Sequence, residues 1–206
     1  MEIGFLIKSF LAIFTIVDPI GAVPLFLNIT SNYSREERKR VAFMSSVTVL
    51  VTLTIFLWIG KLILNFFHIS ISSFKIAGGA LLFITAIEML FGRVGQVKTS
   101  AQEMSYFKEK EDIAIVPLGI PYLAGPGAIT TVIILGENTT LIQKVSLFFI
   151  IGGVALSIYL FLSQAYLIFK FLGELGTKAT IRILGLILAT IATEYILTGI
   201  KETFKL

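Results

Sequence analysis

Long apolar stretches separated by short polar segments run through the whole chain of 206 residues. Six of these stretches are long enough for an α-helix to cross a bilayer, which takes about 20 residues for about 30 Å of hydrocarbon. They cover residues 3–29, 41–67, 72–91, 113–135, 145–172 and 181–200. The pattern therefore predicts an all-α membrane protein with six transmembrane helices.

Two of the six stretches are interrupted near their middle by residues that disfavour a helix. The first contains Asp18-Pro19-Ile20-Gly21-Ala22, and the fourth contains Gly125-Pro126-Gly127-Ala128. Proline removes a backbone donor and clashes with the preceding turn. Unwound backbone at mid-membrane depth is tolerated only where it is buried in protein or lines a cavity. We therefore expect helices 1 and 4 to be broken near the membrane midplane, with both breaks inside the protein.

The two halves of the chain resemble each other when one is shifted by 107 residues without a gap. This shift places Pro19 on Pro126, Gly78 on Gly185 and Gly92 on Gly199, and it also pairs Lys75 with Arg182. Each half holds three predicted helices, so the halves must be inverted relative to each other in the membrane. We predict a single membrane domain over residues 1–206, made of two inverted three-helix repeats (1–92 and 113–206) joined by a loop at 93–112. Inverted repeats with broken helices are typical of secondary transporters.

Composition supports a membrane protein and excludes several other classes. Hydrophobic residues make up 56% and charged residues 15% of the chain, with a mean hydropathy of +0.92, whereas soluble domains carry about 25% charged residues. The absence of cysteine excludes disulfides and thiolate-ligated metal sites. Basic and aromatic residues do not alternate along any one face, so we expect no nucleic-acid partner. We expect no metal and no cofactor.

The distribution of lysine and arginine predicts the orientation in the membrane. Three connections with their flanks, at 32–40, 92–112 and 170–182, carry eleven of these residues, and the opposite side carries six. The positive-inside rule places the richer connections in the cytoplasm. We therefore expect a multi-pass protein of the plasma membrane with both termini outside and with an uncleaved first helix.

Asp18 is the strongest candidate for a functional residue. An acidic residue at the centre of an apolar span costs roughly 3 kcal/mol on insertion scales, so it is a functional candidate by default. Asp18 could act as a helix cap alone, since Asp before Pro suits the start of the following half-helix. It could also face a site and bind a cation, a proton or a substrate amine, and these two roles are compatible.

The second break carries no charge, and it suggests binding of an anion. Its glycines allow backbone to approach a ligand closely, and the helix after Pro126 would offer N–H groups with a partial positive charge. The hydroxyls of Thr130 and Thr131 could add to such a site. The alternative is a kink that only packs against its neighbours.

Two further acidic residues, Glu88 and Glu194, lie near the ends of the third and sixth stretches. Each could face the interior and relay protons, or could reach water at the end of its helix. Gly78, Gly79 and Gly185 are expected to allow close helix packing. No arrangement of nucleophile, base and orienting group is recognisable in the sequence, so we do not expect an enzyme.

These motifs together resemble the MarC family of six-span membrane proteins. The first signature is Asp18-Pro19-Ile20-Gly21 with Pro24 and the basic Arg35-Glu36-Glu37-Arg38 segment, and the second is Gly125-Pro126-Gly127-Ala128-Ile129. A third is Arg182-Ile183-Leu184-Gly185 with Gly199-Ile200 at the end of the helix. Within the family, the chain is most similar to the archaeal SnatA-type transporters of small neutral amino acids. Relatives often have Asn where this chain has Ala22, and more often an amide at position 194.

The resemblance implies ion-coupled uptake of glycine and alanine, with substrate held at the two broken helices. Residues implied for substrate binding are Asp18, Pro19, Gly21, Ala22, Gly125, Pro126, Gly127, Ala128, Thr130 and Thr131. The coupling ion could be H⁺ or Na⁺, with Asp18, Glu88 and Glu194 as candidates for coupling. Alternatives are an exporter of drugs or small metabolites and a membrane structural factor that transports nothing. Faces of small residues would also serve a homo-oligomer.

Overall fold

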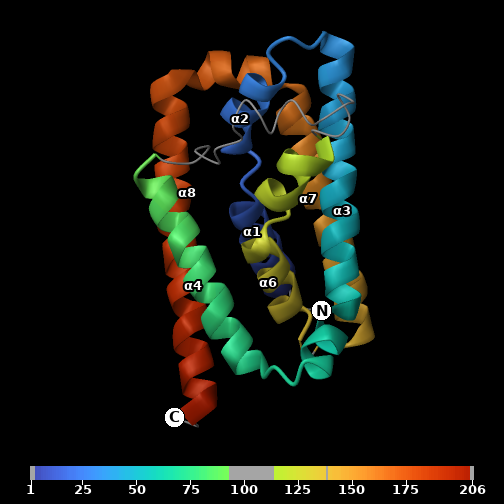
Figure 1. Cartoon of the computed structure of the whole chain (residues 1–206), viewed down its shortest axis with the longest axis vertical. Helices are drawn as coiled ribbons and strands as arrows, with labels where there is room; N and C mark the ends of the chain where they lie inside the picture. The colour runs from blue at the N-terminus through green and yellow to red at the C-terminus, as the bar shows by residue number, and fades with distance from the viewer. Residues whose placement is uncertain (1–2, 93–113, 138, 205–206) are drawn as a thin grey trace.

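In the computed structural model, residues 3–92, 114–137 and 139–204 are described, and their regular structure is entirely helical (Figure 1). The elements are α1 (Ile3–Val17), α2 (Ala22–Ile29), α3 (Arg35–Phe66), α4 (Ile71–Leu90), η1 (Ala114–Leu123), α6 (Pro126–Leu135), α7 (Leu141–Ser163) and α8 (Ala165–Phe204). Four of them, α3, α4, α7 and α8, are long and apolar enough to cross a membrane. A fifth crossing is formed if α1 and α2, which meet at 41°, are taken as one broken span.

The helices form two outer pairs around a central group. Figure 1 shows α4 beside α8 on one side, α3 beside α7 on the other, and α1, α2, η1 and α6 between them. The pair α3 and α7 is antiparallel, because the ring of Phe43 near the start of α3 meets that of Tyr159 near the end of α7. At the opposite ends of these two helices, the Lys144 ammonium lies 5.8 Å from the centre of the Trp58 ring. Both predicted breaks belong to the central group; Asp18 and Pro19 of the first are buried, whereas Pro126 of the second is exposed.

Close backbone packing of α4 against α8 is made possible by glycines, as the sequence predicted. A Cβ atom at Gly79 would lie 2.8 Å from the carbonyl oxygen of Ala192, and one at Gly185 would lie 2.8 Å from Met89 Cβ. Farther along, a Cβ at Gly199 would lie 2.7 Å from the carbonyl oxygen of Ser72. Such distances leave no room for a side chain, so α4 and α8 pack as one unit.

The helix that we predicted over residues 41–67 begins earlier, at Arg35. Ser34 caps it: the Ser34 hydroxyl accepts from Glu37 N–H at 3.3 Å, and the Ser34 N–H donates to Glu37 Oε2 at 2.8 Å. This reciprocal pair is a capping box. The basic residues predicted to form a loop therefore belong to the first turns of α3.

The prediction of one helix over residues 145–172 followed by a loop at 173–180 was wrong. The helix α7 ends at Ser163, and Gln164 after it leaves the helical conformation (φ −105°, ψ 13°). The next helix, α8, begins at Ala165 and turns sharply at Gly173 (φ 65°, ψ −178°). Residues 174–180 are helical, supported by Thr177 Oγ1 donating to the Gly173 carbonyl at 2.7 Å. The first part of α8 consequently lies across one end of the molecule (Figure 1).

Candidate functional site

The first break lies between α1 and α2 and is built around Asp18. Pro19 cannot continue α1 because it has no N–H group and its ring clashes with the preceding turn. Asp18 therefore adopts a left-handed conformation (φ 48°), which Asp tolerates better than most residues. Its carboxylate turns back over the break, where Oδ1 accepts from the Gly21 N–H at 2.9 Å. The side chain is buried, since Asp18 is only 6% exposed.

Gly21 is needed for this arrangement. A Cβ atom at Gly21 would collide with the Asp18 carboxylate. After Gly21 the chain returns to a helix, with the Ala22 N–H donating to the Asp18 carbonyl at 3.1 Å. Asp18 and Gly21 thus form one structural unit, a buried carboxylate resting on the first turn of α2.

The second break lies between η1 and α6. Within η1, Val116 and Ile120 are extended, and each is followed by a proline, which disfavours helical backbone in the residue before it. Gly125 is extended and begins α6 without a side-chain cap, and Pro126 occupies the first turn. The first N–H groups of α6 therefore have no partner within their own helix. This end of α6 carries partial positive charge.

The two breaks meet in space. The hydroxyl of Tyr122, four residues before Pro126, donates to the carbonyl of Gly21 at 3.3 Å. On the other side of the breaks, a Cβ at Gly127 would lie 3.5 Å from Ile16 Cγ2 of α1. A buried carboxylate, an unwound turn of backbone and a helix N-terminus are therefore neighbours.

Sequence reasoning missed Tyr122, although a signal was present. It lies between Pro121 and Gly125, in a stretch where broken backbone was expected, and its hydroxyl needs a partner in an apolar surrounding. The contact with Gly21 depends on how η1 packs against α2, and this packing is not visible in the local sequence.

A cavity of about 390 Å³ reaches the first break. Its lining includes Gly21, Pro24, Leu25, Asn28, Tyr122 and Thr177. At its mouth Lys178 and Glu174 of α8 form an exposed ion pair of 2.5 Å. This volume is within the range of small-molecule sites, about 300–1,000 Å³.

The other predicted site residues fall into two groups. Pro19, Ala22, Ala128, Thr130 and Thr131 are buried close to the breaks, whereas Pro126 is exposed. Thr130 packs into the space left by Gly78 of α4. The buried residues of this set therefore lie between the breaks and the outer pair α4 and α8.

Glu88 and Glu194 are not brought to the breaks. Both are exposed, and Glu194 accepts a bond of 3.4 Å from Thr198 on its own helix. Within the part of the chain that the structure describes, no group of three or more His, Cys, Asp or Glu residues could hold a metal ion. Any role of these two glutamates in coupling would have to act at a distance from Asp18.

Comparison with known proteins identifies the family. The profile described as MarC family integral membrane protein matches residues 3–204. The chain belongs to the MarC family. A UPF0056 membrane protein of Pyrococcus abyssi is 39% identical over 195 residues, which cover 95% of this chain and 94% of the relative. One of Escherichia coli is 36% identical, covering 96% and 92% of the two chains.

Another MarC relative, a UPF0056 membrane protein of Aquifex aeolicus, is 35% identical over 206 residues and covers 99% of this chain. No solved structure matches this MarC family member. The likeness extends over both breaks and both outer pairs.

Proposed function

We propose that this MarC family member is a secondary active transporter of small neutral amino acids such as glycine and alanine, working by alternating access. One observation carries the proposal: two broken helices meet beside the buried Asp18 carboxylate, and a cavity reaches them at Gly21 and Tyr122. Secondary transporters typically hold substrate and coupling ion where two discontinuous helices meet near the membrane midplane.

An inverted repeat of two sets of three helices underlies this proposal. Its first set is α1 with α2, α3 and α4, and its second is η1 with α6, α7 and α8. Two pairs of equivalent elements lie in contact, α3 with α7 and α4 with α8. These contacts between equivalent elements support a two-fold relation between the halves.

The chemistry of the breaks suits a zwitterion. The substrate carboxylate would meet the N–H groups at the start of α6, where the partial charge is positive. The substrate amine would meet the Asp18 carboxylate and carbonyl groups such as that of Gly21. Both breaks are closely packed, since a Cβ at Gly21 would collide with the Asp18 carboxylate and one at Gly127 with Leu82, and we propose that this packing restricts the size of the substrate. This restriction favours glycine and alanine over larger amino acids.

Coupling to an ion gradient completes the proposal. Asp18 is the acidic residue at the breaks, and a carboxylate with neighbouring carbonyl groups can bind Na⁺ or carry H⁺. The cavity is lined by Gly92 and by Glu174 and Lys178 of α8, which belong to two of the basic connections, so we place it on the cytoplasmic side of the plasma membrane.

Uptake into proteoliposomes tests the proposal. Labelled glycine is supplied under an imposed Na⁺ gradient and, in parallel, under an imposed H⁺ gradient. We expect accumulation under one of the two, abolished in Asp18→Asn and retained in the control Glu36→Gln, which alters an exposed carboxylate. Glu88→Gln and Glu194→Gln, assayed in the same way, test whether either residue contributes to coupling.

Failure under both gradients would reject amino acid uptake, provided that the protein is folded and inserted. The same vesicles loaded with glycine would then test movement in the opposite direction. Uptake that persists unchanged in Asp18→Asn would show that the first break does not bind substrate or ion.

A further inference from the structure

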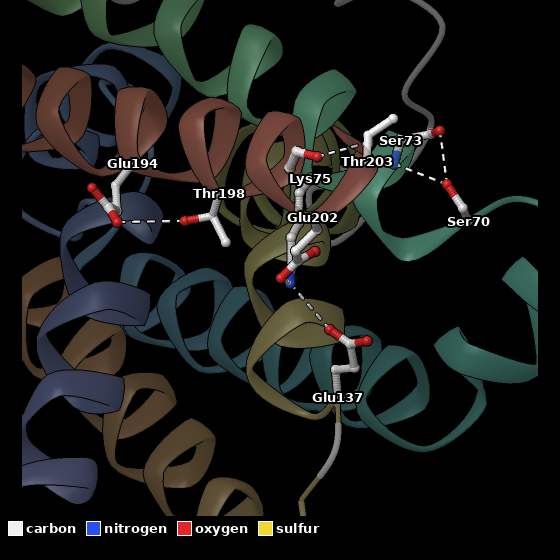
Figure 2. Close-up of polar contacts among 9 residues, drawn as sticks. Ser70, Ser73, Lys75, Glu137, Glu194, Thr198, Glu202 and Thr203 are labelled. Carbon is white, nitrogen blue, oxygen red and sulfur yellow. Dashed lines mark hydrogen bonds and ion pairs between the residues drawn. The ribbon is translucent and has the colours of Figure 1, made fainter. Parts of the chain in front are cut away.

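A buried lysine joins three helical elements at the end of the molecule opposite the cavity. Lys75 of α4 is 8% exposed. Its Nζ lies 2.6 Å from Glu202 Oε1 of α8 and 3.3 Å from Glu137 Oε2, just after α6 (Figure 2). Two carboxylates therefore share one ammonium. Removing the partner of a buried charge is strongly unfavourable, so this group fixes the end of α6 against α4 and α8.

Two of the three charges belong to one rigid unit. Beside Lys75, a Cβ at Gly199 of α8 would lie 2.7 Å from the Ser72 carbonyl and 3.2 Å from Lys75 Cβ. Backbone packed this closely cannot slide. Lys75 and Glu202 therefore stay together whenever α4 and α8 move as a pair.

Glu137 belongs to a different unit. The contacts of α6 with α4 run through side chains, with Thr130 in the space beside Gly78 and Leu82 beside Gly127. Side-chain contacts can re-form after a small shift, whereas close backbone contacts hold a fixed geometry. The α6 end with Glu137 is thus the part of this cluster that can move relative to the outer pair.

We propose that Lys75, Glu137 and Glu202 form a gate that closes this end of the molecule, and that the gate opens when Lys75 parts from Glu137 and keeps Glu202. The proposal rests on the alternating-access function proposed above. With two carboxylates available, Lys75 remains paired in both states. Glu137 borders a small hollow of about 40 Å³ that Lys61 of α3 also lines, so the released carboxylate would turn toward water and a second cation.

The equivalent residue in the other half supports this asymmetry. Arg182 corresponds to Lys75 under the 107-residue shift. It is exposed, whereas Lys75 is buried, and it follows Lys178 and Ile181, which line the cavity. At the closed end the basic residue, Lys75, is therefore buried and paired, and at the open end its equivalent, Arg182, is exposed. Alternating access in an inverted repeat predicts this difference.

Thiol labelling tests the gate without any substrate. The chain has no cysteine, so Ile133→Cys introduces a single reporter. Ile133 is 7% exposed and lines the small hollow together with Glu137. A membrane-impermeant thiol reagent is applied to reconstituted protein, and the labelling rate reports how often this end opens.

The two glutamates should act in opposite directions. Glu137→Gln removes the pair that exists only in the closed state, so we expect labelling to accelerate by about tenfold, the effect of losing one favourable pair. Glu202→Gln leaves Lys75 unpaired in the open state, so we expect slower labelling. The control Glu36→Gln alters an exposed carboxylate at the start of α3 and should leave the rate unchanged.

If Glu137→Gln and Glu202→Gln change the labelling rate in the same direction, the cluster is only a structural ion pair. If neither variant changes the rate, the proposed gate is rejected. Thermal unfolding of each variant identifies any loss of folding. If Glu137→Gln does not fold, Glu137→Asp, which shortens the reach, should accelerate labelling in the same direction. If the two variants change the labelling rate in opposite directions but the protein takes up no glycine, the gate is retained and the proposed substrate is rejected. If neither variant changes the rate but glycine uptake is normal, the gate is rejected and the proposed function is retained.

Discussion

At the scale of single residues, the site depends on a carboxylate and the glycine beneath it. Asp18 and Gly21 were predictable from the sequence because an acid and two helix breakers stand out in an apolar stretch. Tyr122 was not, since its partner is the Gly21 carbonyl, 101 positions earlier, and only tertiary packing brings the two together. The local sequence therefore predicted the first break, whereas the contact of Tyr122 with that break depends on how η1 packs.

Replacement of Gly21 tests whether the carboxylate must rest on α2. In Gly21→Ala the added methyl group collides with the Asp18 carboxylate. We expect loss of gradient-driven uptake and a destabilisation of roughly 1–3 kcal/mol from overpacking. Thermal unfolding and uptake are measured together.

The matched control is Gly152→Ala in α7, where an added Cβ has no neighbour within 4 Å. It should retain uptake and gain roughly 0.5–1 kcal/mol, because alanine is the better helix former. Normal uptake in Gly21→Ala would contradict the fixed carboxylate.

The Tyr122 hydroxyl can be removed without changing the ring. In Tyr122→Phe the bond to the Gly21 carbonyl is lost, which removes roughly 0.5–1.5 kcal/mol and should lower the apparent affinity for glycine by about 2–10-fold. Concentration dependence of uptake measures this change. Tyr159→Phe serves as control, because the described contact of Tyr159 is ring to ring with Phe43; equal effects in both variants would remove Tyr122 from the site.

At the scale of elements, proline and glycine allowed both breaks to be predicted, while the continuous apolar run from 145 to 172 concealed the end of α7. Hydropathy does not distinguish a helix that crosses the membrane from one that lies across its end. The turn at Gly173 determines the direction of α8, because its backbone (φ 65°, ψ −178°) is in a region that is essentially restricted to glycine.

Replacement of Gly173 tests that turn. Gly173→Ala should destabilise the protein by roughly 1–3 kcal/mol through backbone strain alone, since no atom lies within 4 Å of an added Cβ. Gly176→Ala, three residues later, meets only an ordinary contact of 3.4 Å and should be neutral or stabilising. Thermal unfolding in lipid nanodiscs compares them, and equal stability of the two variants would contradict the kinked α8.

At the scale of the whole molecule, the sequence predicted a membrane protein with two similar halves, and the helical architecture of the described residues is confirmed. The pairing of α4 with α8 could be anticipated from Gly79 and Gly185, which small-residue packing favours, whereas Gly78 faces Thr130 of α6. The pairing of α3 with α7 could not, because their contacts involve aromatic side chains of which the chain has many. The loop predicted at 93–112 lies outside the described residues.

Substrate protection tests most directly whether the two breaks hold a small amino acid. Leu25 lines the cavity next to the first break, so Leu25→Cys provides a single reporter in a chain without cysteine. Labelling by a small thiol reagent should be slowed by glycine and alanine, unaffected by leucine, and insensitive to all three in the control Leu167→Cys on the exposed surface. Unprotected Leu25→Cys in protein that still transports glycine would place the substrate away from the breaks.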